Sequence, residues 1–232
     1  MSKFPNGRGE IGVASAEITL LASQGAMASS AAATPATIQE GSLVALCQKG
    51  DPDAFSRLVA LHEHMVFNLA FRLTGDPEEA KDVAQDVFLL VYRMLGRFQG
   101  RSSLNTWIYR IVVNQCHNRR RFWKRRFKDR SLPLEDMTPR DEARCSEVGA
   151  EATSPYEELR RREAKRTVQA ALLELTFEHR AILLLREVEG LSALQVAPSL
   201  GLPEGTVKSR LSRAREALRH RLRCRLEPGG RP

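Results

Sequence analysis

The sequence has few of the residues that build metal centres, disulfide frameworks or membrane spans. Its four cysteines are far apart and form no CxxC pair: Cys47, Cys116, Cys145 and Cys224. Neither His62 nor His64 completes a zinc-ligand spacing with any of them. No run approaches the roughly 20 apolar residues that a membrane span needs. We therefore expect no cofactor and no membrane insertion, and reduced thiols in a cytoplasmic protein.

Motifs for covalent chemistry are also missing. The sequence contains no P-loop, no catalytic-triad pattern and no metal cluster. A nuclease would need carboxylates at metal-ligand spacing, whereas Glu79, Asp82 and Asp86 have the i, i+3, i+7 spacing of a stripe along one helix. We predict that the protein is not an enzyme. Strand-like alternation is absent as well, which predicts an all-α fold.

Positive charge is in excess. The 232 residues include 36 Lys and Arg against 28 Asp and Glu, which gives a net charge of +8 and a pI near 9.7. Such an excess favours a polyanionic partner but does not define a fold. The length is enough for one domain or for two small ones.

Helical periodicity falls into two blocks separated by a basic, then acidic and turn-rich, stretch. The chain begins with a segment rich in Ser, Ala and Gly, which favours disorder. We predict, in chain order, a disordered tail over 1–38, a helical domain over 39–121, a flexible linker over 122–154, a second helical domain over 155–225 and a disordered tail over 226–232.

Three helices are expected in the longer part of the first block. Residues 50–53 and 74–77 each place Asp before Pro, the residues favoured at the N-cap and the first helical position. Residues 96–103 read as a loop, and the helix that follows is expected to end near 119–121.

Residues 192–215 have the layout of a helix-turn-helix, with a Gly-containing turn between two helices. A second helix of this kind fits the major groove, where its first turns reach base edges and flanking Arg and Lys pair with phosphates. A basic solvated face is the alternative; the turn and the mixture of Ser, Thr and Arg favour DNA binding. Pro198 lies inside the first helix and predicts either a kink or a helix of one turn.

Two runs carry a family resemblance: GLPEGTVKSRLSRAR over 201–215 and DVAQDVFLLVYRML over 82–95. In this order they resemble regions 4 and 2 of the extracytoplasmic-function (ECF) sigma factors of bacterial RNA polymerase, over about 40–121 and 155–222. The resemblance implies two small helical domains, one region-2-like and one a region-4-like helix-turn-helix, joined by a flexible linker. It also implies a chain that binds core RNA polymerase and directs initiation at promoters, and that an anti-sigma factor can hold.

An acidic stripe is a poor surface for DNA, so in a basic protein it suggests a protein partner; a solvated face is the alternative. The resemblance implies that this surface binds core polymerase, through Glu79, Asp82, Gln85, Asp86, Phe88, Leu89, Tyr92 and Arg93.

Residues 97–110 resemble the element that captures the melted −10 strand. A base taken from the duplex needs a polar pocket, and its strand needs cationic and stacking groups. Trp107 also has the helical spacing of a core residue. The residues expected to bind the −10 strand are Phe98, Gln99, Gly100, Arg101, Ser102, Asn105, Trp107, Arg110, Asn114, Asn118, Arg119 and Arg120.

The helix-turn-helix is expected to read the −35 element as duplex DNA. The residues expected at that surface are Glu204, Gly205, Thr206, Lys208, Ser209, Arg210, Ser212, Arg213 and Arg215. A stand-alone helix-turn-helix regulator is the alternative function; it accounts for 192–215 but leaves the acidic helix and residues 97–121 unexplained.

Overall fold

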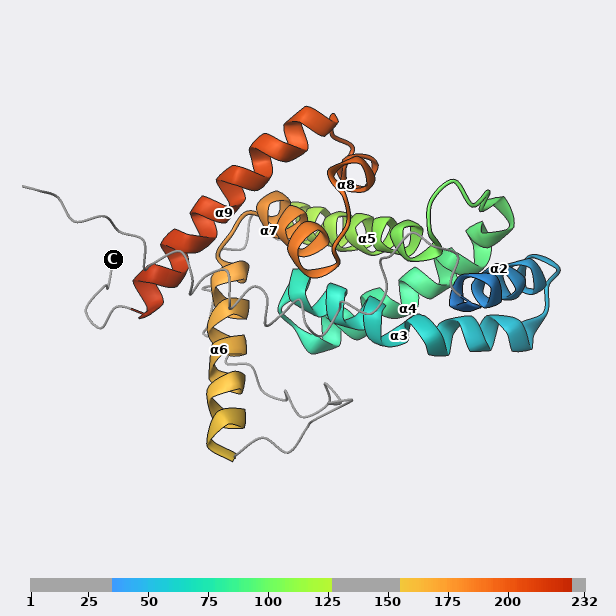
Figure 1. The fold of residues 1–232 in the computed structure, drawn as a ribbon, viewed down its shortest axis with the longest axis horizontal. Helices are drawn as coiled ribbons and strands as arrows, with labels where there is room; N and C mark the ends of the chain where they lie inside the picture. The colour runs from blue at the N-terminus through green and yellow to red at the C-terminus, as the bar shows by residue number, and fades with distance from the viewer. Residues whose placement is uncertain (1–34, 127–154, 227–232) are drawn as a thin grey trace, which may run out of the picture.

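The computed structural model describes residues 35–126 and 155–226, coloured in Figure 1. Over these two ranges the chain forms helices and no strand, as the periodicity predicts. The first half contains α2 (Pro35–Gln48), α3 (Pro52–Thr74), α4 (Pro77–Met94), the 3-10 turn η1 (Leu95–Arg97) and α5 (Leu104–Arg126).

The second half contains the helix-turn-helix and its supports. Its elements are α6 (Pro155–Leu173), α7 (Phe177–Leu183), the π-helical turn η2 (Leu184–Val188), α8 (Ala193–Leu200) and α9 (Glu204–Leu226). The helix that begins at Phe177 therefore continues to Val188 but changes its winding at Leu184.

The predicted helix boundaries at 50–53 and 74–77 are confirmed. Asp51 caps α3 by accepting from the backbone N–H of Asp53 at 2.9 Å, and Asp76 caps α4 by accepting from that of Glu79 at 2.7 Å. Gly75 ends α3 with φ +84°, a conformation that costs glycine little. A Cβ at Gly75 would also lie 2.6 Å from Leu173 of α6, so the turn doubles as a packing contact with the second half.

Three predicted segment limits differ from the structure. α2 begins at Pro35, so 35–38 of the predicted tail are helical. α5 runs to Arg126, five residues into the predicted linker, because Arg and Lys are good helix formers and no Gly or Pro interrupts 122–126. α9 ends at Leu226, one residue past the predicted domain limit. The remaining parts of the predicted tails and linker, 1–34, 127–154 and 227–232, lie outside the described residues.

The two halves share one hydrophobic core, with α5 at its centre (Figure 1). One side of α5 packs on α3 and α4, where Ile108 and Val112 are fully buried, and the other side packs on α8. The sequence predicted two small domains on a linker. In this structure they are docked against each other.

Polar groups buried at the junction hold the halves together. Arg180 of α7 donates to the carbonyls of Leu172 at 2.9 Å and Leu173 at 2.7 Å, both in its own half, and to that of Leu73 in α3. Because burial disfavours its charge, the pKa of Arg180 falls to about 10. The junction is thus anchored by a guanidinium that serves both halves.

A second buried contact joins α5 to the start of the helix-turn-helix. The Tyr109 hydroxyl donates to Glu189, whose side chain is only 6% exposed, and Arg72 Nη1 lies 3.6 Å from the same carboxylate. Burial raises the pKa of Glu189 above its ordinary value, against the opposing effects of Tyr109 and Arg72.

Candidate polymerase and DNA interfaces

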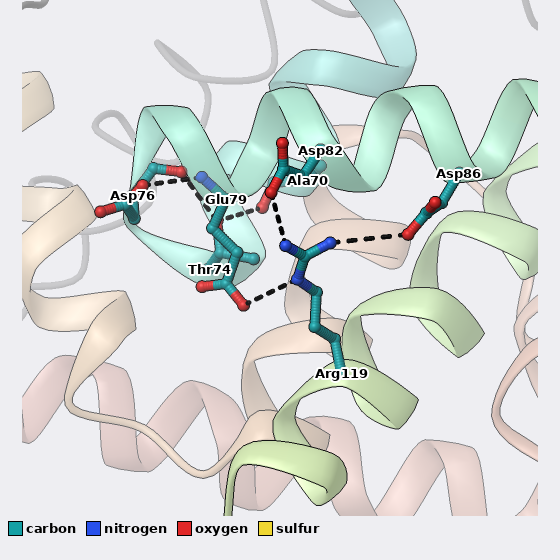
Figure 2. Close-up of polar contacts among 7 residues, drawn as sticks. All are labelled: Ala70, Thr74, Asp76, Glu79, Asp82, Asp86 and Arg119. Atoms are coloured by element: carbon teal, nitrogen blue, oxygen red, sulfur yellow. Dashed lines mark hydrogen bonds and ion pairs between the residues drawn. The ribbon is translucent and has the colours of Figure 1, made fainter.

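The acidic stripe of α4 faces one arginine of α5 (Figure 2). Arg119 Nη2 lies 2.6 Å from Asp82, Nη1 lies 3.5 Å from Asp86, and Nε lies 3.8 Å from Glu79. Burial raises the pKa of Glu79, while Arg119 opposes that rise. The structure therefore joins three residues predicted to bind polymerase to one predicted to bind DNA.

The rest of the predicted polymerase surface lies along the outer side of α4. Leu89 is 56% exposed and Tyr92 is 62% exposed, although Tyr92 keeps an edge contact with Phe55 at 5.0 Å between ring centroids. Gln85 and Arg93 are exposed, and Phe88 is half-buried against the core. Large apolar side chains next to exposed carboxylates are typical of a protein-binding surface.

The predicted −10 loop is built around two aromatic rings. Phe98 and Trp107 are half-buried, with centroids 5.2 Å apart. Gly100 turns the loop with φ +68°. Gln99 and Arg101 are exposed and Ser102 is half-buried. Trp107 packs at the margin of the core, which supports the core interpretation of its spacing without excluding contact with a base.

Two features of this loop were not predicted. The side-chain amide of Gln48 in α2 donates to the carbonyls of Leu95 and Phe98, each at 3.0 Å, so α2 supports the loop from behind. Asn105 Oδ1 is buried and accepts no hydrogen bond within the described part of the chain. An acceptor of this kind is costly to leave unpaired unless a ligand uses it.

The polar residues along α5 do not form one surface. Arg119 joins the acidic stripe, whereas Arg120 lies 5.7 Å above the Phe177 ring in the second half. Arg110 is half-buried, and Asn114 and Asn118 are exposed. The predicted set is therefore divided between two sides of the helix.

An open hollow of about 390 Å³ lies between α4 and the end of α5. Its lining combines polar and aromatic side chains and consists of Val83, Asp86, Gln115, Asn118, Arg119, Phe122 and Trp123. Gln115, Phe122 and Trp123 were not among the predicted site residues. Phe122 and Trp123 were missed because the helix was predicted to end at 121, which assigned both residues to the linker.

The helix-turn-helix forms in spite of Pro198. Ser192 and Gln195 make a reciprocal capping box, with bonds of 3.2 and 2.8 Å, and Gly201 ends α8 with φ +64°. α8 is eight residues long, so the prediction of a one-turn helix is wrong. Pro198 is exposed and stands at the sixth position, where it removes one N–H donor of the helix.

α9 presents most of the predicted −35 residues to solvent. Its buried side carries Val207, Leu211 and Ala214. The residues exposed on its other side are Glu204, Gly205, Lys208, Ser209, Ser212, Arg213 and Arg215, while Thr206 and Arg210 are half-buried. Lys208 pairs with Glu204 at 3.4 Å, and Arg215 pairs with Glu187 of η2 at 2.6 Å.

The described residues contain no group of three metal-binding side chains. None of their helices combines the length and the apolar character needed to cross a membrane.

Comparisons with known proteins match each half. The family model Sigma-70 region 2 matches residues 58–127, and Sigma-70, region 4 matches residues 165–218. Two helical units matching these models in this order define a sigma-70-type transcription factor.

Relatives that match both halves of the chain define the family within this class. The RNA polymerase sigma-H factor of Pseudomonas aeruginosa is 38% identical over 180 residues, which cover 78% of this chain and 92% of the relative. The ECF RNA polymerase sigma factor SigW of Bacillus subtilis is 32% identical over 76% of this chain and 92% of its own. The chain belongs to the extracytoplasmic-function sigma factors.

A solved structure shares the fold. The sigma factor RpoE of Bartonella quintana, in complex with the anti-sigma factor NepR, aligns with a TM-score of 0.58 at 23% identity, over 73% of this chain and 96% of the other.

Proposed function

We propose that this chain binds core RNA polymerase through the outer side of α4 and holds promoter DNA on two separate surfaces. The melted −10 strand lies on the loop 98–103 and α5, and the −35 duplex lies on α9. The protein acts in the cytoplasm, where polymerase works, and performs no covalent chemistry. One observation carries the proposal: α4 exposes carboxylates and large apolar side chains directly beside the basic helix α5.

The contact with polymerase rests on charge and apolar area together. Asp82 and Asp86 are more than half exposed, and Leu89 and Tyr92 extend the surface along the same helix. Cationic groups of a partner would pair with the carboxylates, while the apolar side chains supply area removed from water.

Capture of the −10 strand rests on the loop and its aromatic support. An unstacked base can contact the Phe98 and Trp107 rings, and the unpaired oxygen of Asn105 can accept from an exocyclic amino group. These interactions form only with a separated strand, so they offset the cost of unpairing the duplex.

Reading of the −35 duplex rests on α9. Its exposed side presents Lys208, Ser209 and Arg213 from consecutive turns, at the spacing at which a recognition helix meets base edges and phosphates. Arg215 contributes once it leaves Glu187.

Binding both elements at once requires the halves to separate. The −35 and −10 elements are about 25 base pairs apart, which is about 85 Å of B-DNA at roughly 3.4 Å per base pair. In this structure α8 packs directly on α5, and Tyr109 bonds Glu189. The described form is therefore a closed one, and an anti-sigma factor that binds both halves would stabilise it.

The test is a titration of labelled core polymerase with the full chain. Asp82→Lys with Asp86→Lys should weaken the complex at least tenfold, as expected when paired charges become repulsive. Glu78→Lys is the matched control, because Glu78 is on the same helix but pairs only with Lys81 in the described contacts. Unchanged affinity of the double variant would refute the α4 contact.

Transcription separates the proposal from a stand-alone regulator. With purified core polymerase and a pool of genomic promoters, the chain should start transcription at a defined subset of them. A chain that binds duplex DNA but neither core nor any promoter in this assay would be a helix-turn-helix regulator instead.

A further inference from the structure

In this structure the predicted polymerase surface on α4 and a predicted DNA-binding residue on α5 form ion pairs with each other. The carboxylates of α4 were expected to meet polymerase, and Arg119 of α5 was expected to meet DNA. Figure 2 shows the Arg119 guanidinium between Glu79, Asp82 and Asp86, with its shortest contact, 2.6 Å, to Asp82. Polymerase would have to displace Arg119 in order to bind the carboxylates, and DNA would have to displace the carboxylates in order to bind Arg119.

The N–H groups that Arg119 directs at the carboxylates are the same groups that would bind a phosphate. A guanidinium binds carboxylates and phosphates with the same planar set of N–H donors. Here Nε, Nη1 and Nη2 each point to a carboxylate, and three carboxylates surround one cation. A strand phosphate approaching Arg119 therefore meets excess negative charge and a donor set already in use.

The cluster is partly shielded from water, which makes it more than an exposed ion pair. The Arg119 side chain is 27% exposed and that of Glu79 is 32% exposed. An isolated surface pair contributes little, whereas three partners on a half-buried cation are screened less. The backbone beneath Arg119 is fixed, because Val112 and Cys116 of the same helix are buried in the core.

A position for the strand lies beside the cluster. The hollow next to Arg119 is lined by the amides of Gln115 and Asn118 and by the rings of Phe122 and Trp123, together with Val83 and the Asp86 carboxylate of α4. Aromatic rings on which bases stack are typical of single-strand sites, and amides can hydrogen-bond the edges of unpaired bases. Arg119 itself lines this hollow, so its guanidinium lies next to the position considered for the strand.

We propose that Arg119 couples polymerase binding to strand capture. In the free chain the α4 carboxylates hold Arg119. When cationic groups of polymerase take those carboxylates, Arg119 is released to a phosphate of the −10 strand. This inference rests on the proposed function of α4 and α5. Coupling of this kind is reciprocal, so strand binding also favours polymerase binding.

The first test is a double-mutant cycle on the full chain without polymerase. The probe is a fluorescein-labelled, mixed-sequence single-stranded DNA about 12 nucleotides long, since phosphate contacts do not depend on sequence. Asp82→Asn with Asp86→Asn should tighten binding about fivefold when Arg119 is present. In the Arg119→Gln background the same pair should change binding less than about twofold.

The controls make each outcome decisive. Glu78→Gln removes one negative charge from the same helix without touching Arg119 and should have almost no effect. An equal gain with and without Arg119 would mean that the carboxylates act only through net charge, and no gain would mean that Arg119 is not held back. Either result overturns the coupling.

The second test uses core polymerase. Arg119→Gln removes the cation that pairs with the α4 carboxylates, so the variant should bind core about twofold to fivefold more tightly, while its complex with core should bind single-stranded DNA more weakly than the wild-type complex does. Misfolding would weaken both, and that result, like weaker binding to core alone, would contradict the proposal. If charge reversal of Asp82 and Asp86 leaves core affinity unchanged, the proposed function of α4 fails. If core affinity falls but the cycle is additive, only the coupling fails.

Discussion

The two DNA-binding surfaces of this sigma factor differ in how they are held before any partner binds. On α9 most side chains expected to read the −35 element extend into solvent from a helix whose other side is core; Lys208 pairs locally with Glu204, and Arg215 pairs with Glu187 of η2. On α5 two of the expected −10 residues are engaged, Arg119 with the α4 carboxylates and Arg120 with the Phe177 ring, and the neighbouring Tyr109 bonds Glu189.

From this difference we infer that the two proposed surfaces recognise DNA in different ways. Duplex DNA can dock on a rigid helix without rearranging it, so its surface can be formed in advance. A melted strand exists only at an opening promoter, so a surface that is released by polymerase avoids binding unrelated strands. The closed junction through Arg180 and Glu189 keeps both surfaces in one compact form.

We expect the largest effect from removing Arg180, which anchors the junction between the two halves. Arg180→Met leaves the carbonyls of Leu73 and Leu173 without their buried donor, and each unsatisfied group costs about 1–3 kcal/mol, whereas the Leu172 carbonyl still accepts from the backbone N–H of Leu175. We expect the free energy of unfolding to fall by about 3 kcal/mol or more. Urea unfolding measures it, with Arg186→Met as the control, since Arg186 donates to the carbonyl of Leu191 within its own half. An equal loss in both variants would show that Arg180 does not link the halves.

Removing cations from α9 should weaken only the preformed surface. Lys208→Ala with Arg210→Ala should lower affinity for a −35 duplex by about 2 kcal/mol, or roughly 30-fold, and reduce its salt dependence by about two phosphate contacts. Affinity for core polymerase should not change. Fluorescence anisotropy measures both. Parallel loss of core binding would indicate misfolding or a wrong assignment of this surface.

Restoring the hydrogen bond that Pro198 removes from α8 should stabilise the helix-turn-helix that carries the −35 surface. Pro198→Ala supplies an N–H donor inside α8, and the stability gained should exceed the loss of proline's restriction on the unfolded chain. We expect about 1 kcal/mol more stability, by thermal unfolding, and slightly tighter duplex binding. A decrease in stability would show that Pro198 fits α8 without strain.

The smallest effect concerns pH at the junction. Because burial raises the pKa of Glu189, its protonated form is favoured on folding. Its contribution to stability is thus present below the ordinary pKa near 4.5 and is lost as pH rises through the raised value. Glu189→Gln cannot titrate, so the stability of wild type relative to this variant should fall with rising pH. A relative increase would show that the pairing with Arg72 dominates burial.

The sequence was sufficient for the local features of the fold. The Asp-Pro pairs predicted the starts of α3 and α4, and the Gly-containing turn predicted the helix-turn-helix, because caps and turns depend on nearby residues. The length of α5 past residue 121 could not be predicted as easily, since a basic run suits a helix end and a linker equally well.

The long-range contacts could not be read from the sequence. Arg119 is 33 residues from Asp86, and Tyr109 is 80 residues from Glu189. Periodicity places each residue on one side of its own helix but says nothing about which helix lies opposite. The engaged state of the −10 surface, and therefore the proposed coupling, depends on this information.

The most direct test of the account measures both surfaces with and without polymerase. A labelled −35 duplex and a labelled −10 single strand are titrated with the free chain, with the chain bound to core, and with core alone. The account predicts that the free chain binds duplex measurably but the single strand poorly. Core should then raise affinity for the strand far more than affinity for the duplex, beyond what core contributes alone. Equal gains for both, or a free chain that already binds the strand as tightly as the polymerase complex does, would contradict it.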